Sequence, residues 1–569
     1  MKNKTRWTAL LLAVCLCLAL TACGGKGQGE AESPSPTPEQ SGQPSPAPSA
    51  GPRDGLTVRV GAEPGSIDPT AVASQNEIIL TSHMFEGLMK WAPSGRSLSA
   101  GVESAQVVPG MAETYERAQG EDGRVTYTFH LRQNAKWSDG KAVTAHDFVY
   151  AWQRLLAPEH NAQYAGLLAD VAGVDALKAG QAQVADLGLR AVDDATFEVT
   201  LTQEVPWFLE LCAMPFTAPV RQDVVEEAGN QWTYGPETYM TNGPYKLKSW
   251  NHNLELVAEK DPEYYESVAG PQTITFSFYT DVADGQSAYD AGNLDFLLGA
   301  DPAGEKTEQA PYLASYYVMF QTGQAPFDNA LVRQAFALAV DRSKLIENQA
   351  PGQSPAGALV PAGTVGPDGA AGADFRAHAG DCFDPAAKAA SANREKAKTL
   401  LSQAGYPGGA GFPEVTYLCP NSPAQAAIGE ALAQMWQETL GVTVTVESVE
   451  WSVFLQRCHQ GEFSMARGRW VADYNDPTAF LDLWRTGEPG NDAGYREAQY
   501  DELLDRADQA DDPSRRMELL AQAEDLLIGR DYALAPLYFE SESYLMKEGV
   551  KGVYYSPLGW FFFVNAQVK

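Results

Sequence analysis

The chain has 569 residues, more than one compact core usually holds, so two or three domains are expected. Apolar residues make up 44% of the chain, which is enough to fold it. Its 73 acidic residues outnumber the 41 basic ones and give a net charge of -32, the wrong sign for binding nucleic acid or anionic lipid. We therefore exclude nucleic acid as a partner and interpret the acidity as a source of solubility.

The first 22 residues have the layout of a secretory signal. Lys2, Lys4 and Arg6 precede an apolar run over residues 9–20, which is too short to span a bilayer. The run ends in Leu20-Thr21-Ala22-Cys23, which resembles a lipobox, where the chain is cut before the Cys and the thiol is lipidated. We predict a signal peptide over 1–22 and lipidation of Cys23. An ordinary signal peptide with an incidental Cys is the alternative.

Residues 23–55 have the composition of a tether. Gly, Ser, Gln and Pro dominate, and the repeated prolines over 33–38 and 44–48 favour extended polyproline II. Such a spacer holds a folded body away from a membrane. We expect the protein outside the cytoplasm, anchored by lipid to the outer face of the cytoplasmic membrane, or in a periplasm if the cell has two membranes.

Four cysteines remain once the signal and the lipid anchor are set aside: Cys212, Cys382, Cys419 and Cys458. An exported chain permits disulfides, and four thiols allow three full pairings. Nothing in the spacing chooses among these pairings. Unpaired buried cysteines are equally compatible with the sequence.

The body alternates short β-rich runs with helical stretches, which predicts an α/β architecture. Strands are expected at residues 56–60, 125–129, 196–201 and 442–446. Helices are expected at residues 145–156, 330–345, 394–404 and 424–440, with Gly405 and Gly441 ending the last two.

Two of these helices have a defined apolar face. In the helix over 145–156, Thr144 can cap with Asp147, and Phe148, Trp152 and Leu155 share one stripe. In the helix over 330–345, the pattern leaves Arg333 and Arg342 free to stay in water.

Several motifs together resemble the family 5 extracellular solute-binding proteins, and within that family the oligopeptide-binding group. The most recognisable is the run over 137–148, Trp137-Ser138-Asp139-Gly140-Lys141-Ala142-Val143-Thr144-Ala145-His146-Asp147-Phe148. The other matching segments are residues 63–69, 83–88, 241–245, 326–335 and 397–406. They follow the expected order along nearly the whole body.

The resemblance implies a periplasmic-binding-protein-like fold with two main lobes, an extra domain and a cleft that closes by hinge bending. We expect lobe I at 56–75, 196–315 and 537–569, domain II at 76–195, and lobe III at 316–536. The implied function is capture of short peptides and delivery to the permease subunits of an ABC importer, by a monomer that needs no cofactor, no metal and no catalytic group.

The resemblance places the ligand contacts between residues 451 and 476. A peptide brings one ammonium at its N-terminus, and burying that charge is costly unless a carboxylate meets it. Asp473, at the matching position, is the predicted partner. The alternative is that Asp473 only caps a turn before Asn475-Asp476-Pro477.

A binder of many sequences holds the peptide main chain, which strand-like hydrogen bonding achieves. Backbone groups from Trp470 through Val471 to Ala472 are expected to do so, with Trp470 and Trp451 as pocket walls or as packing residues. Arg467 matches a family arginine that can meet a ligand carboxylate, or it forms a salt bridge within the lobe. Tyr317 and Glu63 are at positions that can line the family's cleft.

Two departures from the family pattern concern the far end of longer peptides. The region over 421–425 lacks a His that some relatives place there, and Cys458 stands where they have an Arg, with Arg457 one place earlier. The sequence therefore leaves the preferred peptide length open.

The sequence also bears on the alternative functions, a secreted hydrolase and binders of other ligands. A secreted hydrolase lacks support, because no His-Glu-x-x-His, Gly-x-Ser-x-Gly or phosphate-binding glycine loop occurs, although paired carboxylates are not excluded. Other ligands within the family are dipeptides, nickel chelates, haem and oligosaccharides, and a peptide-pheromone sensor is a further alternative. The ammonium-pairing Asp473 favours peptide over sugar.

Overall fold

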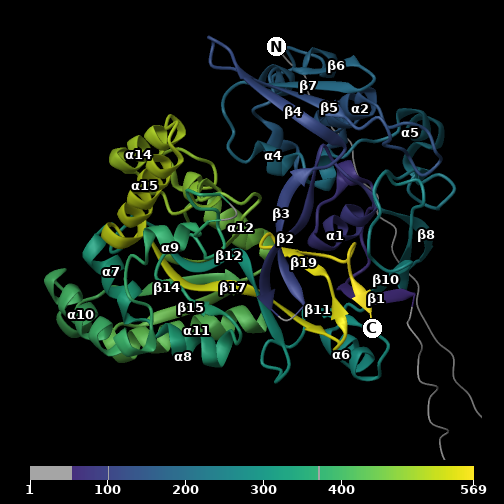
Figure 1. Cartoon of the computed structure of the whole chain (residues 1–569). Coiled ribbons are helices and arrows are strands. Elements are labelled where there is room, and N and C mark those ends of the chain that lie inside the picture. The colour runs from purple at the N-terminus through teal and green to yellow at the C-terminus, as the bar shows by residue number, and fades with distance from the viewer. Residues whose placement is uncertain (1–53, 100, 370–371, 569) are drawn as a thin grey trace, which may run out of the picture. The chain divides into compact units, whose positions relative to one another are not determined.

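The computed structural model describes residues 54–99, 101–369 and 372–568 of the chain. Among these residues the largest sheet has eleven strands, in the order β15-β14-β16-β12-β17-β11-β1-β10-β9-β8, with β13 paired to β17 (Figure 1). Its strands are β1 (Gly55–Gly61), β8 (Tyr245–Asn251), β9 (Glu255–Lys260), β10 (Thr273–Phe278), β11 (Phe296–Leu298), β12 (Glu308–Phe320), β13 (Ser354–Pro355), β14 (Val415–Pro420), β15 (Val444–Val449), β16 (Met465–Val471) and β17 (Leu534–Met546).

Strands β12 and β17 are the two long elements of this sheet, with 13 residues each. They pair antiparallel, and the register shifts between Pro311 and Ser315 and again between Tyr316 and Tyr317. One end of β17 pairs with β11, and the far end of β12 pairs with β16. The predicted boundaries between lobes I and III, at 315/316 and 536/537, fall inside these two strands. The lobe boundaries remain a prediction.

Three smaller sheets accompany the large one in the described part of the chain. Their orders are β2-β3-β19-β20, β4-β5-β7-β6 and β18-β21. The strands are β2 (Met89–Ser99), β3 (Val102–Pro109), β4 (Ala112–Gln119), β5 (Val125–Leu131), β6 (Leu189–Asp193), β7 (Thr196–Leu201), β18 (Val550–Lys551), β19 (Val553–Ser556), β20 (Trp560–Phe562) and β21 (Gln567–Val568). Strand β7, which the predicted boundary at 195/196 assigns to lobe I, hydrogen-bonds with β5 and β6.

Helices pack around these sheets. They are α1 (Gln75–Met84), α2 (Ala145–Leu156), α3 (Val174–Lys178), α4 (Phe208–Leu211), α5 (Gln222–Ala228), α6 (Val282–Asp290), α7 (Ala330–Ala339), α8 (Arg342–Gln349), α9 (Phe375–Ala379), α10 (Ala390–Gln403), α11 (Pro423–Leu440), α12 (Trp451–His459), α13 (Thr478–Leu481), α14 (Ala498–Asp508) and α15 (Pro513–Glu524). Figure 1 shows α11 beside β14 and β15, where an apolar cluster joins α7, α10 and α11 to the sheet. No helix in the described part of the chain is long and apolar enough to cross a bilayer.

The strands and helices that the sequence predicted are found with small shifts, except for the helix over 330–345. The helix over 145–156 and the strand over 196–201 are confirmed at both ends. Strand β15 begins two residues later than expected, and α10 begins four residues earlier. Gly441 ends α11 in the left-handed conformation, at φ 72°, as predicted.

The prediction of one helix over 330–345 was wrong. Val340 is extended, at φ -81° and ψ 124°, and Asp341 begins α8 by accepting a hydrogen bond from the Lys344 N–H. The expected exposure of Arg333 and Arg342 was also wrong, because their side chains are only 6% and 2% exposed. Both guanidinium groups donate to backbone carbonyls, from Arg333 to Phe327 at 2.7 Å and from Arg342 to Pro536 at 2.8 Å.

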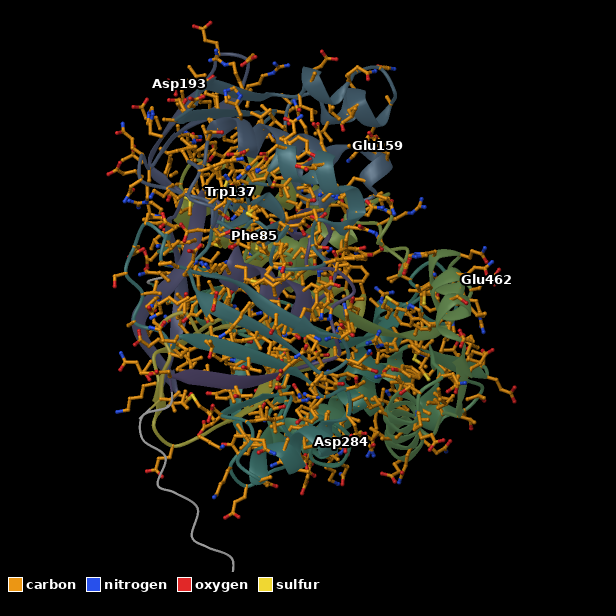
Figure 2. The ribbon with its side chains drawn as sticks, turned by 90° about the vertical axis from the view of Figure 1, so that its right-hand side faces the viewer. Phe85, Trp137, Glu159, Asp193, Asp284 and Glu462 are labelled. Atoms are coloured by element: carbon orange, nitrogen blue, oxygen red, sulfur yellow. The ribbon has the colours of Figure 1, made fainter. Side chains whose placement is uncertain are left out.

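The run over 137–148, the most recognisable family motif, has a structural role. Trp137 is fully buried, and its indole N–H donates to Asp147 Oδ2 at 3.3 Å. The same carboxylate accepts from the Thr144 N–H at 2.8 Å and so starts α2. Figure 2 labels Trp137 and Phe85 in the interior, whereas the exposed Asp193 lies at the edge. The contacts of Trp137 and Asp147 therefore serve the fold.

The four cysteines of the body are free thiols in this structure. Cys212, Cys419 and Cys458 are buried, and Cys382 is half-buried. Of the alternatives that the sequence left open, the structure shows the unpaired one. Burial raises the pKa of the Cys212 thiol, which keeps that thiol protonated and unreactive.

Candidate functional site

Strand β16 forms the centre of the predicted site. It runs antiparallel to β12, with Val471 opposite Ala314 and Arg467 opposite Val318. On its other side β14 pairs only with Met465 and Ala466. Among the described residues, the outer edge of β16 therefore has no strand partner beyond Ala466.

The register shows which backbone groups face that open edge. The Ala472 N–H donates to the Leu313 carbonyl at 2.8 Å, and the Gln321 N–H donates to the Ser464 carbonyl at 3.1 Å, so even-numbered residues of β16 exchange hydrogen bonds with β12. In an antiparallel pair, hydrogen-bonded and non-hydrogen-bonded residues alternate. The N–H and C=O groups of Arg467, Arg469 and Val471 therefore point away from β12, toward the open edge.

Asp473 lies just past the end of β16. Its side chain is exposed, and within the described residues it forms no hydrogen bond and no ion pair. Enough protein nevertheless surrounds the carboxyl for desolvation to raise the pKa of Asp473. Asp473 is therefore an exposed carboxylate that no described side chain or backbone group neutralises. Its predicted alternative role, as a turn cap, belongs instead to Asp476, which accepts from the Thr478 N–H at 3.0 Å.

Tyr164 lies close to Asp473 and was not found in the sequence. Desolvation and then the neighbouring charge of Asp473 raise the pKa of Tyr164 to about 12. Its ring stacks on Phe216, with 5.0 Å between the centroids. No local pattern around Tyr164 indicates a site, since the contact joins segments that are far apart in the sequence.

Trp470 and Ala472 alternate with Val471 along the strand. The Trp470 indole N–H donates to the Ala479 carbonyl at 2.7 Å, which fixes this half-buried ring beside β16. Ala472 is 6% exposed. Trp470 and Val471 therefore end the strand, Ala472 follows it and continues the hydrogen bonding to β12, and the backbone of Val471 faces the open edge.

Arg467 has no carboxylate partner in the described part of the chain, so the salt bridge weighed as an alternative is absent there. Its guanidinium lies 5.2 Å above the centre of the Tyr316 ring, and its Nε is buried without a hydrogen-bond acceptor. The Arg467 side chain shares a sheet face with the Tyr316 side chain. It is a cation that a ligand carboxylate can approach.

The other predicted residues occupy different surroundings. Trp451, at the start of α12, is 51% exposed and stacks on Phe454 at 5.6 Å. Tyr317 is 4% exposed and packs edge-on against Trp484 at 5.8 Å. Glu63 accepts from His252 Nδ1 at 2.7 Å and from the Asn253 N–H at 2.9 Å, both in the turn between β8 and β9. Tyr317 and Glu63 thus have packing and hairpin partners of their own.

A second charged group on the face of Arg467 escaped the sequence reasoning. Arg469 forms two hydrogen bonds with Glu540, at 2.7 and 2.8 Å. Glu542, two residues further along β17, accepts from Gln75 Nε2 at 3.0 Å. Desolvation, together with the charge of Glu540, raises the pKa of Glu542 to about 7. These glutamates lie on β17, where the sequence contains no recognisable site motif.

The two departures from the family pattern have visible consequences. Arg457 is bound to Glu447, with its Nη1 2.6 Å from Glu447 Oε1, and Cys458 is 1% exposed. Gln425, in the region that lacks the His, accepts a hydrogen bond from the Tyr316 hydroxyl. Arg457 therefore does not replace the missing family arginine at an open position.

Comparison with known proteins defines the class of protein first. The fold matches the unliganded open form of the periplasmic murein tripeptide-binding protein MppA with a TM-score of 0.76 and 29% identity, covering 91% of this chain and 97% of that one. It matches Haemophilus influenzae OppA in complex with RPPGFSPFR with a TM-score of 0.67 and 29% identity, covering 91% and 99%. The predicted α/β, periplasmic-binding-protein-like fold is confirmed.

The family follows from the sequence. The model of the bacterial extracellular solute-binding proteins, family 5, matches residues 106–492. The periplasmic oligopeptide-binding protein OppA of Salmonella typhimurium is 35% identical over 508 residues, which is 86% of this chain and 88% of the relative. The chain belongs to the family 5 extracellular solute-binding proteins, and the predicted resemblance is confirmed.

Proposed function

We propose that this protein is the extracytoplasmic substrate-binding component of an ABC importer, which binds short peptides and delivers them to a membrane permease. One observation carries the proposal: the open edge of β16 ends at Asp473, a carboxylate without a partner in the described structure. The edge supplies main-chain hydrogen bonds, and the carboxylate supplies a counter-charge for an N-terminal ammonium. Together they match the two features that all short peptides share.

The same geometry orients the peptide. With its ammonium at Asp473, the peptide adds to β16 as an antiparallel strand and runs toward Arg467. Positions 473 and 467 differ by 6 residues, which is roughly 20 Å of extended chain at about 3.3 Å per residue. The unpaired Arg467 guanidinium then meets the C-terminal carboxylate of a peptide of about that length.

Thermal melting with a free and an N-acetylated tripeptide tests the proposal. Trialanine is expected to raise the Tm of the wild type, whereas acetyl-trialanine and the Asp473→Asn variant show little or no shift. The matched control is Asp193→Asn, at an exposed site, which keeps the full shift. Equal stabilisation by the acetylated peptide would refute ammonium pairing.

The protein is proposed to bind peptides without cleaving them. Peptide recovered after incubation is expected to have its original mass. Cleaved fragments would favour the hydrolase alternative. A dipeptide, nickel chelate, haem or oligosaccharide as the main ligand would leave trialanine without effect, and a pheromone sensor would bind peptide without supporting uptake.

The lipid anchor is proposed from the sequence alone, because Cys23 lies outside the described residues. Lipidation of Cys23 places the monomeric binding protein on the outer face of the cytoplasmic membrane, beside its permease. The Cys23→Ser variant is expected in the medium or the soluble fraction. Its retention with membranes would contradict the anchor.

A further inference from the structure

The residues directly after Asp473 contact the N-terminal part of α4. This helix packs against the four-stranded sheet β4-β5-β7-β6, which we call the small sheet. The ring of Tyr474 stacks flat on Trp207, with 4.2 Å between centroids and 7° between planes. Beside it, the Asn475 N–H donates to Glu210 Oε1 at 3.2 Å. These contacts join residues about 265 positions apart. We call Trp207, Glu210, Tyr474 and Asn475 the latch.

The Trp207 and Glu210 half of the latch is anchored on the small sheet. Trp207 is the N-cap of α4, and Glu210 lies within this helix. Phe208, between them, packs against Tyr127 of β5 at 4.8 Å and against Trp152 of α2 at 6.2 Å. A movement of the small sheet therefore carries Trp207 and Glu210 with it.

The other half of the latch is anchored beside α15. The Asn475 side chain accepts from the Val365 N–H at 2.8 Å, and Asp476 binds Arg516 through two hydrogen bonds of 2.7 and 2.9 Å. The turn after β16 is thus held from two sides. Of the polar residues in this turn, 473–476, only Asp473 has no side-chain partner among the described residues.

The pKa of the Glu210 carboxyl differs from that of an ordinary glutamate. Desolvation, opposed by the Asn475 N–H and reinforced by the charge of Asp476, raises the pKa of Glu210 to about 8. Glu210 lines a cavity of about 1360 Å³. The other charged groups that line it are Arg117 from β4, Glu204 from the segment after β7, Asp368 from the 365–369 loop, Asp476 from the turn after β16, and Asp505, Asp508, Asp511 and Arg516 from the α14–α15 region. Carboxylates predominate, so ionisation of Glu210 adds repulsion at the latch.

We propose that Trp207 and Glu210 are positioning residues for Asp473: by holding Tyr474 and Asn475, they set the carboxylate toward the peptide ammonium and couple its occupation to the position of the small sheet. The inference rests on the proposed function, since it concerns the same ammonium site. Glu210 acts through the Asn475 backbone and does not touch the ligand.

Isothermal titration with trialanine tests the latch. Glu210→Ala and Tyr474→Ala each remove one contact and are expected to weaken binding roughly tenfold, as the loss of about one hydrogen bond or one aromatic stack predicts. Glu210→Gln keeps the acceptor for Asn475, and Tyr474→Phe keeps the stack, so both are expected to bind within about threefold of the wild type at pH 6. Unchanged affinity in both alanine variants would overturn the proposal.

A pH series separates positioning from simple packing. The peptide amine itself titrates near pH 8, so the informative quantity is the ratio of wild-type Kd to Glu210→Gln Kd at each pH, from which the amine cancels. This ratio is expected to rise between pH 7 and 9, as Glu210 ionises beside Asp476 in the wild type only. A constant ratio contradicts the coupling.

Two controls make the outcomes distinguishable. Glu204→Ala removes a carboxylate of the same cavity that pairs with Arg117 and not with the latch, so its peptide affinity is expected to stay at the wild-type value. Asp473→Asn tests the ammonium site itself. If the wild type binds no peptide, the proposed function fails. If binding requires Asp473 but ignores Glu210 and Tyr474, only the latch fails.

Discussion

His83 shows at the scale of one residue how burial fixes a protonation state. Its side chain is fully buried, Nδ1 lies 2.7 Å from the Ile79 carbonyl, and Nε2 accepts from the Phe563 N–H at 2.9 Å. Only the neutral ring with its proton on Nδ1 satisfies both contacts. Desolvation accordingly lowers the pKa of His83 to about 4.

This pKa predicts an acid-sensitive component of stability. Between pH 6.5 and 4 the unfolded chain binds a proton at this site that the folded chain does not, so His83 contributes full stability above pH 6.5 and loses it as the pH falls toward 4. The loss amounts to about 3 kcal/mol for a shift of roughly 2.5 pH units. Urea unfolding of the wild type and of His83→Gln, measured from pH 7 to 4.5, is expected to show a shallower slope in the variant. Parallel slopes would contradict this assignment.

The Tyr317 ring packs so closely against Gly468 that it leaves no room for a side chain at position 468. A Cβ at Gly468 would lie 2.1 Å from the Tyr317 ring, which is itself packed against Trp484. Gly468→Ala is therefore expected to lower the free energy of unfolding by about 1–3 kcal/mol, the usual cost of overpacking. Adding Tyr317→Leu removes the clashing ring, so the double variant is expected to recover part of the loss in urea titrations. No recovery would mean that the clash lies elsewhere.

At the residue scale, the prediction reached side chains that lie in one continuous family motif. Asp473 and Arg467 were assigned by their match to that motif, with the charged ends of a peptide as the chemical reason. The structure leaves both side chains without an ion-pair partner among its described residues. Tyr164, Trp207 and Glu210 could not be found this way. Their contacts with the 473–475 turn depend on how separate sheets pack, which no spacing in the sequence encodes.

At the scale of elements, the backbone groups of strand β16 fall into two sets that point in opposite directions. Its even-numbered residues complete the ladder to β12, whereas the outward backbone groups of Arg467, Arg469 and Val471 have no strand partner among the described residues. The proposed peptide binding and the ladder to β12 therefore use alternate residues of one strand. This division allows substitutions that affect one without the other.

Val471→Pro tests the division. Proline removes the outward N–H, and strand edges tolerate such a loss. The variant is expected to keep a Tm within a few degrees of the wild type and to bind trialanine about tenfold more weakly, or worse, by titration calorimetry. Its matched control is Ala472→Pro, which removes the ladder donor to Leu313 and is expected to lower the Tm clearly. If Val471→Pro binds normally, the main-chain mode is wrong.

The prediction of one helix over 330–345 failed at Asp341 and Arg342, two charged residues with buried roles that the apolar pattern does not show. The apolar pattern over 330–345 continues across the break, but Asp341 competes for the backbone as an N-cap and starts a new helix. Arg342 then enters the interior, where the Pro536 carbonyl accepts from its guanidinium. Side-chain periodicity alone assigns arginine to the surface. It does not show that the carbonyls of Ala337 and Val340, and of Pro536 on a strand almost 200 residues away, accept from this guanidinium.

At the scale of the whole molecule, the fold matches an unliganded open form better than it matches a peptide complex. The TM-score is 0.76 with an unliganded open form and 0.67 with a peptide complex, although the identity is 29% in both cases. Proteins of this class change conformation by hinge bending, and the long strands β12 and β17 join the two halves of the large sheet. A peptide that binds one conformation better shifts the population toward it.

Peptide binding is therefore expected to change two quantities together: the radius of gyration, measured by small-angle X-ray scattering, and the free energy of unfolding. Trialanine at one hundred times its Kd is expected to reduce the radius of gyration of the wild type and to add about 2.7 kcal/mol to the free energy of unfolding. The Asp473→Asn variant at the same peptide concentration shows neither change, because it lacks the charge that makes binding favourable. Glu210→Ala separates the two readouts: once its weaker affinity is offset by more peptide, the stabilisation returns, but the compaction stays smaller because the latch no longer couples Asp473 to the small sheet. Full compaction in that variant would show that closure is driven by the ligand's other contacts alone.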